Sequence, residues 1–308
     1  MSASVARGID AVLLIGFGGP TTPSEIRPFL DNVTRGRAIP RERLEEVVHH
    51  YESMPGGRSP LNALTQAQAD ALRARLEGRI PVYVGMRNWH PYLHDTLAAM
   101  AHDGRRRALG IVLSTFRCEA SWDRYMADVA AARARVTAAP EIAYAPAWFE
   151  HPRFIAAVAD RVSAALTAIP LDDREQTPLV FTAHAIPRAM AEASPYVSDF
   201  TTAAAAVARR LRHPRWLLTY QSRSGGPREP WLEPDVGETI RDLAKAGERR
   251  VVLVPIGFVV DHVEVLYDLD TQARALAAEH GVAYHRAAAV NDHPEFVAML
   301  ADLVRERA

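Results

Sequence analysis

Short apolar runs alternate with amphipathic stretches along the whole chain. Eight runs rich in Val, Leu and Ile predict β-strands, at Val12–Phe17, Val82–Gly85, Ala108–Leu113, Ile142–Tyr144, Leu179–Thr182, Trp216–Tyr220, Val251–Ile256 and Val282–Tyr284. Stretches in which apolar residues recur every three or four positions predict helices, at Ala67–Leu76, Tyr92–Met100, Ala120–Ala132, Phe154–Leu166, Phe200–Leu211 and Thr271–Glu279. Strands that alternate with helices predict an α/β fold, in which right-handed crossovers build parallel sheets.

An internal repeat divides the predicted strands into two sets of four. His151–Val162 resembles His293–Val304 at an offset of 142 residues, and Gly104–Arg107 resembles Gly247–Arg250 at an offset of 143. Matches at nearly one offset predict two similar doubly wound halves that face each other across a ligand cleft. The alternatives are chance similarity between amphipathic helices and a single closed barrel.

The two predicted halves differ by a long insertion. We predict an N-terminal half of residues 1–170 and a C-terminal half of residues 171–308, joined by a polar, proline-bounded linker. The insertion, about residues 18–81, is longer than an ordinary crossover. It contains His49–Tyr51 and the glycine-rich turn Gly56–Pro60, together with several arginines. These residues suit an anionic aromatic ligand, whereas a solvated surface excursion is the alternative interpretation.

Composition and charge exclude several classes of protein. The 308 residues are 48% hydrophobic and 24% charged, which is typical of a globular protein. The formal net charge of −1 leaves no basic footprint for nucleic acid. The N-terminal apolar run is short and is broken by Gly and Pro, so we expect neither a secretory signal nor stable membrane insertion. We therefore expect a cytoplasmic protein.

Carboxylates gather in the segment Val251–Asp270, where a predicted buried strand leads into a helix. Asp261, Glu264, Asp268 and Asp270 lie within ten residues. On a helix, Glu264 and Asp268 would share one face, a turn apart. Such a cluster at the carboxyl end of a parallel strand is typical of a ligand site. The alternative is ordinary enrichment of acids in the first turn of a helix.

A histidine lies at the end of another predicted strand. His184, in Phe181–Pro187, follows the first strand of the second half, at the same edge of the sheet as the acids. Imidazole and carboxylate together suit a divalent metal such as Fe²⁺, or proton abstraction. A satisfied core histidine is the alternative. A Gly-x-Ser-x-Gly elbow is absent from the sequence, which disfavours serine hydrolysis.

Two further loops follow predicted strands. Gly16–Pro20 has too few glycines at the required spacing for a dinucleotide fingerprint, and Pro20 lacks an amide proton, so we exclude nucleotide binding. Gln221–Asp235 is a long polar loop with Arg228 and the buried-type Trp231. It is either a mobile surface loop or a rim that supplies polar donors to a ligand.

These motifs together resemble the ferrochelatase family nearly from end to end and in the family's order. The segments that carry the resemblance are Gly18–Pro20, Gly57–Pro60, Thr182–His184 with Pro187, Gln221–Ser222 with Pro230–Leu232, and Gly257–Asp268. The last of these is long and highly specific. The resemblance implies two Rossmann-like halves, each a four-stranded parallel sheet flanked by helices. It also implies a lyase that inserts Fe²⁺ into a porphyrin in heme biosynthesis.

The resemblance implies catalytic and metal-binding residues. His184 and Glu264 match the family's catalytic pair, which we expect to face each other across the porphyrin, with His184 neutral near pH 7. Both, together with Asp268, are expected metal ligands. The family's row of carboxylates usually continues with an acid where this chain has Gln272, which puts an outer metal site in doubt.

The resemblance also implies porphyrin contacts. The expected porphyrin-binding residues are Phe17, Thr34, Arg35, His50, Tyr51, Ser59, Tyr125 and Ser222. Phe17 stands where several members have a tyrosine that can ligate the product iron, so no axial ligand is assigned. Thr34 and His50 stand where some members have propionate-binding arginines.

The polar insertion favours one substrate. Asn32–Arg37 resembles the coproporphyrin III enzymes, and Ile39–Tyr51 lacks the hydrophobic lip that protoporphyrin IX enzymes tend to carry. We therefore expect conversion of coproporphyrin III to coproheme. The alternatives are a protoporphyrin IX ferrochelatase, a cobalt or nickel chelatase of another tetrapyrrole, and a non-catalytic tetrapyrrole carrier.

The cysteine count and the family resemblance also give expectations about cofactors and partners. Cys118 is the single cysteine, so we expect no disulfide within the chain and no iron–sulfur cluster. No cofactor is expected beyond the substrate Fe²⁺. The expected partners are the porphyrin, Fe²⁺ and, transiently, neighbouring enzymes of heme synthesis. We expect a monomer.

Overall fold

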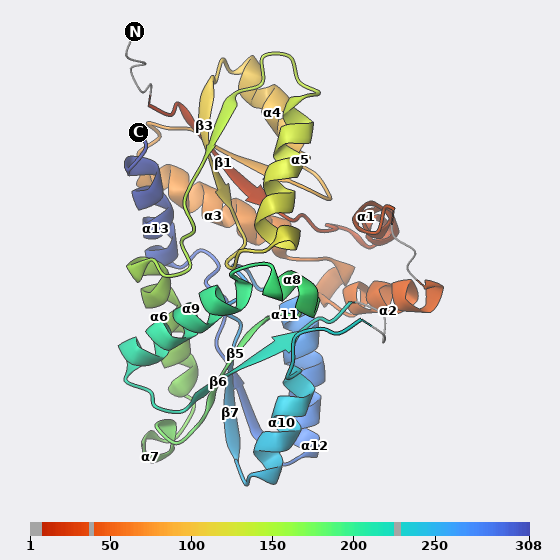
Figure 1. The fold of residues 1–308 in the computed structure, drawn as a ribbon, viewed down its shortest axis with the longest axis vertical. Coiled ribbons are helices and arrows are strands. Elements are labelled where there is room, and N and C mark those ends of the chain that lie inside the picture. The colour runs from red at the N-terminus through yellow and green to blue at the C-terminus, as the bar shows by residue number, and fades with distance from the viewer. Residues whose placement is uncertain (1–7, 37–39, 225–228) are drawn as a thin grey trace.

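Two four-stranded parallel sheets form the protein, one above the other in Figure 1. The computed structural model describes residues 8–36, 40–224 and 229–308. The first sheet, in the order β2-β1-β3-β4, contains β1 (Ala11–Gly16), β2 (Val82–Met86), β3 (Arg107–Val112) and β4 (Glu141–Tyr144). The second, in the order β6-β5-β7-β8, contains β5 (Leu179–His184), β6 (Trp216–Gln221), β7 (Arg250–Val254) and β8 (Ala283–Arg286). The predicted strands and the α/β class are confirmed, and the barrel is excluded.

Helices connect the strands as the alternating pattern predicts. The α-helices are α1 (Ile26–Val33), α2 (Arg41–Glu52), α3 (Leu61–Arg75), α4 (Leu93–His102), α5 (Arg124–Arg133), α6 (Pro152–Leu166), α7 (Leu171–Arg174), α8 (Arg188–Glu192), α9 (Tyr196–Leu211), α10 (Val236–Lys245), α11 (Val263–Val265), α12 (Arg274–Glu279) and α13 (Pro294–Arg305). Two 3₁₀ turns, η1 (Pro23–Glu25) and η2 (Pro55–Gly57), and two π-helices, η3 (Glu119–Asp123) and η4 (Leu266–Ala273), complete the described chain.

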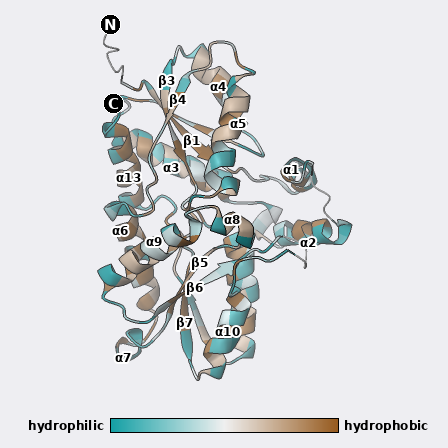
Figure 2. Cartoon of the chain, viewed as in Figure 1, coloured by the Kyte–Doolittle hydropathy of each residue, from teal (hydrophilic) through white to brown (hydrophobic). Residues whose placement is uncertain are grey.

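The central strands are buried on both faces, which explains why their sequences are continuous apolar runs. All six residues of β1 are buried, and so are the first five residues of β5. Figure 2 shows the same strands as hydrophobic, with hydrophilic residues on the outer faces of the helices. The edge strands β4 and β8 are less buried than the central strands.

The repeat is visible as two helices that begin in the same way. His151 precedes α6 and accepts a hydrogen bond from the backbone N–H of Arg153; His293 precedes α13 and accepts one from Glu295, both at 3.2 Å. Each helix then packs across the halves, α6 against α9, β7 and β8, and α13 against α3. The two helices also pack against each other (Figure 1). The division at residue 170 stays a prediction.

The long insertion packs against the second half. Helices α1 and α2 lie beside the sheets at the right of Figure 1. Their buried Phe29 and Tyr51 belong to one apolar cluster with Trp89 and with Val263, the first residue of α11. The insertion is therefore in contact with the acidic segment of the second half, which disfavours its interpretation as a solvated excursion.

Candidate active site

The carboxyl ends of β5 and β6 and the segment after β7 converge on one place. His184 is the last residue of β5 and pairs in register with Gln221, the last residue of β6. Gly257, after β7, donates its backbone N–H to the carbonyl of Thr182. A Cβ atom at Gly257 would lie 2.7 Å from Cα of Ala183, so glycine is required for this close approach. The acidic segment that follows is thereby brought beside His184.

The two acids of this segment lie on a helix of unusual type. Glu264 lies in the short helix α11, and Asp268 lies in the π-helix η4. The sequence predicted an α-helix here, because spacing alone does not distinguish i→i+4 from i→i+5 hydrogen bonding. π-Helical turns are rare in proteins, and those that occur often lie at functional sites. Gln272, further along η4, is exposed.

His184 and Glu264 form an ion pair. Nε2 of His184 lies 3.7 Å from Oε1 of Glu264, and the two side chains are 32% and 40% exposed. Burial is the largest single influence on the pKa of His184 and lowers it. The charge and hydrogen bond of Glu264, the carbonyl of Ala185 and the charge of Asp268 together outweigh burial and raise this pKa to about 9. Burial likewise raises the pKa of Glu264, but His184 lowers it to about 2.

The electrostatics of this pair correct one expectation. The pKa of His184 is raised to about 9, so its imidazole is protonated, not neutral, near pH 7. That His184 and Glu264 face each other across the porphyrin stays a prediction. Nδ1 of His184 contacts the carbonyl of Ala185 at 2.5 Å. Since that nitrogen holds its proton there, Nε2 is the one that releases a proton.

Asp268 is held by Ser222. The hydroxyl of Ser222 donates to Oδ2 of Asp268, and Ser222 adopts a left-handed backbone conformation with φ 60°. Burial is the largest influence on the carboxyl group of Asp268; together with the charge of Glu264 it raises the pKa to about 7. Within the described part of the chain, no three or more His, Cys, Asp or Glu side chains form a group that could hold a metal ion.

Three hydrogen bonds that the sequence did not reveal hold the backbone of His184 and Glu264 in place. Nε2 of the buried Gln221 donates to the carbonyl of Glu264 at 2.8 Å. Nδ1 of His262 accepts from the backbone N–H of Glu264 at 3.2 Å and so caps α11. The hydroxyl of Tyr196 donates to the carbonyl of His184 at 2.8 Å.

Aromatic residues from the first half gather around Arg87. The guanidinium of Arg87 lies 4.4 Å from the ring centroid of Tyr125 and 6.0 Å from that of Phe17. Phe17 is 36% exposed, although it is a large apolar side chain. Burial raises the pKa of Tyr125; Arg87 opposes this effect, and the charge of Glu264 adds to it. The position of Arg87 was not predicted from the sequence, because its partner Asp128 is 41 residues away along the chain.

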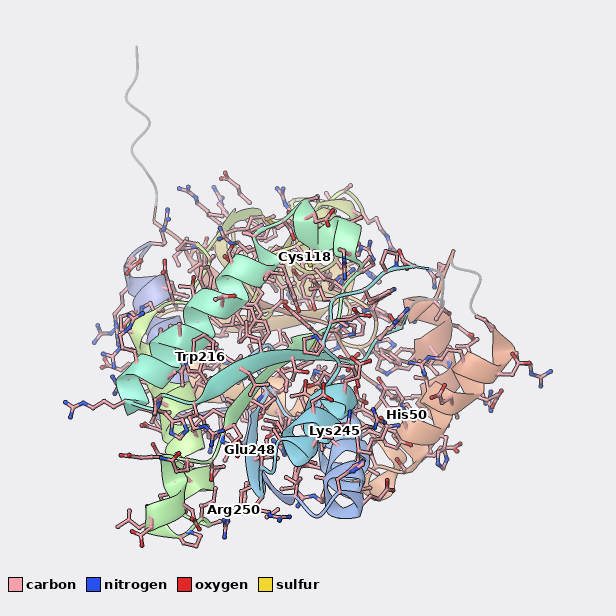
Figure 3. The ribbon with its side chains drawn as sticks, turned by 60° about the horizontal axis from the view of Figure 1, so that its bottom comes forward. His50, Cys118, Trp216, Lys245, Glu248 and Arg250 are labelled. Atoms are coloured by element: carbon pink, nitrogen blue, oxygen red, sulfur yellow. The ribbon has the colours of Figure 1, made fainter. Side chains whose placement is uncertain are left out.

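The insertion contributes His50 and Tyr51. The ring of His50 stacks on Tyr267 of η4 with 3.8 Å between centroids, and Figure 3 shows His50 between α2 and the C-terminal helices. Burial lowers the pKa of His50, so it is neutral at pH 7. Tyr51 is buried and packs edge-to-face on Phe29. Both expected porphyrin residues therefore lie close to the acidic segment.

Three other residues expected to bind porphyrin form hydrogen bonds with residues close to them in the sequence. The hydroxyl of Thr34 donates to the carbonyl of Leu30, and Arg35 donates to Asn32, both next to α1. Ser59 is buried, and its hydroxyl accepts from the backbone of Leu61. These three residues are not brought to His184 by any contact that the structure gives. Arg37, Ile39 and Arg228 lie outside the described residues.

Comparison with known proteins supports one family. A family model described as Ferrochelatase matches residues 9–308. The coproporphyrin III ferrochelatase of Mycolicibacterium smegmatis is 43% identical over 304 residues, covering 96% of this chain and 89% of that protein. The coproporphyrin III ferrochelatase of Frankia alni is 46% identical over 321 residues, covering 99% and 82%.

A solved structure shares the fold. SirB from Bacillus subtilis with Fe³⁺ matches with a TM-score of 0.61 at 12% identity, covering 97% of this chain and 95% of that chain. The structural similarity supports the two-sheet fold, and at 12% sequence identity it shows nothing about function. Within the described residues, no helix is long and apolar enough to cross a membrane. The family match over nearly the full length, together with relatives above 40% identity, shows that this chain belongs to the ferrochelatase family.

Proposed function

We propose that this ferrochelatase inserts Fe²⁺ into coproporphyrin III to give coproheme, a step of heme biosynthesis. The observation that carries the proposal is the ion pair of His184 and Glu264, 3.7 Å apart, with Asp268 nearby on the same segment. Names of relatives with more than 40% identity support coproporphyrin as the substrate. His184 and Glu264 are the proposed catalytic residues, and together with Asp268 they are the proposed ligands of the incoming iron.

The charges of the pair support a mechanism. Metal insertion breaks two pyrrole N–H bonds, forms iron–nitrogen bonds and releases two protons. When Fe²⁺ binds to the carboxylate of Glu264, it cancels the charge that raises the pKa of His184. His184 then releases its proton to solvent, and Nε2 accepts the first pyrrole proton, passes it to solvent and then accepts the second. The iron is a substrate, so it passes through these ligands and leaves with the product.

We propose that the macrocycle packs against Phe17, Tyr51 and Tyr125, which come from the first half. Of the three, Phe17 is the exposed ring, and stacking on an aromatic face is favourable for a large flat ligand. Phenylalanine cannot ligate the product iron, so an axial ligand is not assigned to Phe17. The propionates are proposed to meet Thr34, Arg35, His50, Ser59 and Ser222 after local rearrangement.

The substrate choice gives a testable expectation. Helix α2 is polar, with Arg41 and Glu42 exposed at its start, and coproporphyrin III carries more carboxylates than protoporphyrin IX. We expect kcat/KM to be at least about tenfold higher for coproporphyrin III, a difference of about 1.4 kcal/mol. Anaerobic absorbance assays with each porphyrin and Fe²⁺ measure this ratio. A preference for protoporphyrin IX in detergent would reverse the substrate assignment and leave the family unchanged.

The same assay separates other functions. A faster reaction with Co²⁺ or Ni²⁺ and another tetrapyrrole would favour a chelatase of different metal preference. Porphyrin binding without metal insertion would indicate a carrier. The absence of an iron–sulfur cluster or other cofactor, the monomeric state, transient contact with neighbouring enzymes and a cytoplasmic location stay predictions.

Iron affinity is expected to depend on pH through Asp268. Its pKa of about 7 means that protons compete with Fe²⁺ below pH 7, since only the ionised carboxylate ligates the metal well. The apparent KM for Fe²⁺ should therefore fall as the pH rises from 6 to 8, in anaerobic initial-rate measurements. The Asp268→Ala variant should lose most of this dependence. An equal pH dependence in wild type and variant would show that another group controls it.

A further inference from the structure

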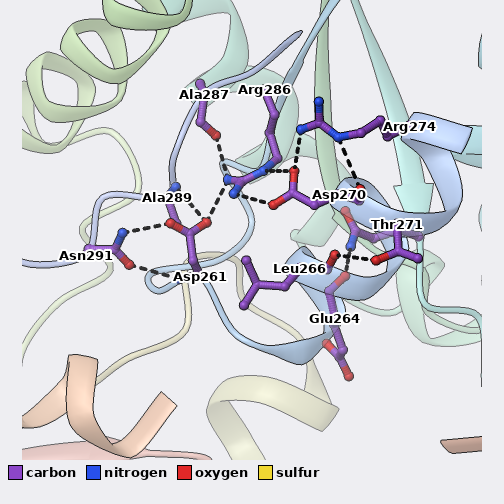
Figure 4. A network of polar contacts seen from close by, with 11 residues as sticks. Asp261, Glu264, Leu266, Asp270, Thr271, Arg274, Arg286, Ala287, Ala289 and Asn291 are labelled. Carbon is purple, nitrogen blue, oxygen red and sulfur yellow. Dashed lines mark hydrogen bonds and ion pairs between the residues drawn. The ribbon is translucent and has the colours of Figure 1, made fainter. Parts of the chain in front are cut away.

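One arginine holds both ends of the segment that carries the two acids. Arg286, at the end of β8, donates from Nε and Nη2 to the two oxygens of Asp270, at 2.8 and 2.7 Å. Its Nη1 donates to Oδ1 of Asp261 at 2.7 Å. Figure 4 shows this guanidinium between the two carboxylates, with Glu264 on the helical segment below them.

The contacts of Asp261 make this end of the segment rigid. Its second oxygen accepts from the side-chain amide of Asn291, which in turn accepts from the backbone N–H of Asp261. The backbone N–H of Ala289 also donates to Asp261. The residue after Asp261 is His262, which caps α11 through the backbone N–H of Glu264. Displacement of Asp261 would therefore be transmitted to Glu264.

Burial makes the arrangement costly to break. The side chains of Arg286, Asp261 and Asp270 are only 12%, 15% and 26% exposed. Removing one member of such a group leaves a poorly hydrated charge without its partner. The planar guanidinium meets two carboxylates at fixed angles, whereas the ammonium of lysine is a single point charge.

We propose that Arg286 is a positioning residue for metal insertion, which fixes the α11–η4 segment at both ends so that Glu264 stays beside His184. This inference rests on the proposed function. Arg286 acts through Glu264 and is separate from the aromatic residues proposed to hold the porphyrin. Its loss should therefore lower the rate of metal insertion and leave porphyrin binding unchanged. Small misplacements of a reacting group can lower a rate by about a hundredfold.

Two arginines provide matched controls. Among the acids of this segment Arg274 pairs with Asp270, at 3.3 Å; its guanidinium also lies 4.9 Å from the ring centroid of Tyr284, and its side chain is 53% exposed. Arg153 also joins two acids, Glu295 and Asp302, at 2.8 and 2.6 Å, but these lie on α13. Arg153→Lys therefore tests the loss of a two-acid contact away from the acidic segment.

The test compares Arg286→Lys, Arg274→Lys and Arg153→Lys with the wild type. Fe²⁺ insertion into coproporphyrin III is followed anaerobically, porphyrin Kd is measured by fluorescence quenching, and folding is checked by thermal unfolding. For Arg286→Lys we expect kcat to fall about tenfold, with porphyrin Kd within twofold of the wild type. The two controls should keep kcat within twofold.

A second variant guards against a protein that does not fold. Asp270→Asn keeps Arg286 and its pair with Asp261, and it should lower kcat severalfold with an unchanged porphyrin Kd. The inference is overturned if both folded variants keep a wild-type kcat, or if porphyrin Kd weakens as much as kcat falls. It is also overturned if Arg153→Lys has the same effect. An inactive wild type would instead refute the proposed function.

Discussion

Replacement of His184 by alanine is expected to abolish metal insertion and to leave porphyrin binding nearly intact. General bases contribute about 10²–10⁴-fold to a rate, and the variant would also leave Glu264 without its cationic partner. We expect kcat to fall by at least about a thousandfold. Porphyrin Kd should change by less than about tenfold, or ~1.4 kcal/mol, because the proposed aromatic contacts come from the first half. Anaerobic insertion assays and fluorescence titrations measure the two quantities.

The controls for this variant test folding and chemistry separately. His102→Ala changes a histidine whose side chain is 90% exposed and should leave kcat unchanged. Added imidazole should partly restore insertion by His184→Ala, since it supplies a proton acceptor to the space that the side chain leaves. A folded His184→Ala protein with a near-normal rate would show that another group accepts the pyrrole protons.

The fold was predictable because its strands are buried on both faces. Continuous apolar runs such as Val251–Ile256 in the sequence correspond to β7 and its neighbours, and the repeat predicted two sheets of four strands. Helices α1 and α2 were not predicted, because α1 is short, α2 is largely polar, and their buried face forms only when they pack together with Trp89 and Val263. Such a face depends on long-range contacts that a local pattern does not contain.

The candidate site was predictable in its residue types but not in its electrostatics. The motif placed His184 and Glu264 at one sheet edge, and the structure confirms that they meet. The sequence did not reveal that their contact raises the pKa of the imidazole, since this depends on a distance of 3.7 Å and not on spacing. Gln221 and Arg286 were missed for a related reason. Their partners are backbone or side-chain atoms 43, 25 and 16 residues away.

Glu264 is expected to matter far more for the maximal rate than Asp268. The Glu264→Gln side chain keeps nearly the same shape, and the backbone of residue 264 stays held by Gln221 and His262. The variant removes the charge that holds a proton on His184 and offers iron a neutral amide oxygen. We expect kcat to fall by about a hundredfold or more, since a charged ligand and the proton balance of the base are lost together.

Asp268→Ala should chiefly raise the apparent KM for Fe²⁺, because Asp268 contacts Ser222 while Glu264 contacts His184. Ser222→Ala is its milder control, since it removes the hydroxyl and keeps the carboxylate. Titration of His184 by NMR gives an independent measure. Glu264→Gln should lower the pKa of His184 from about 9, whereas Asp268→Ala should lower it less, because Glu264 pairs directly with His184 and its charge has the larger effect. A Glu264→Gln enzyme with a normal kcat would refute the assignment. If folded Asp268→Ala protein were equally inactive at saturating Fe²⁺, the two carboxylates would act as one unit, despite the neutral Gln272 that follows them.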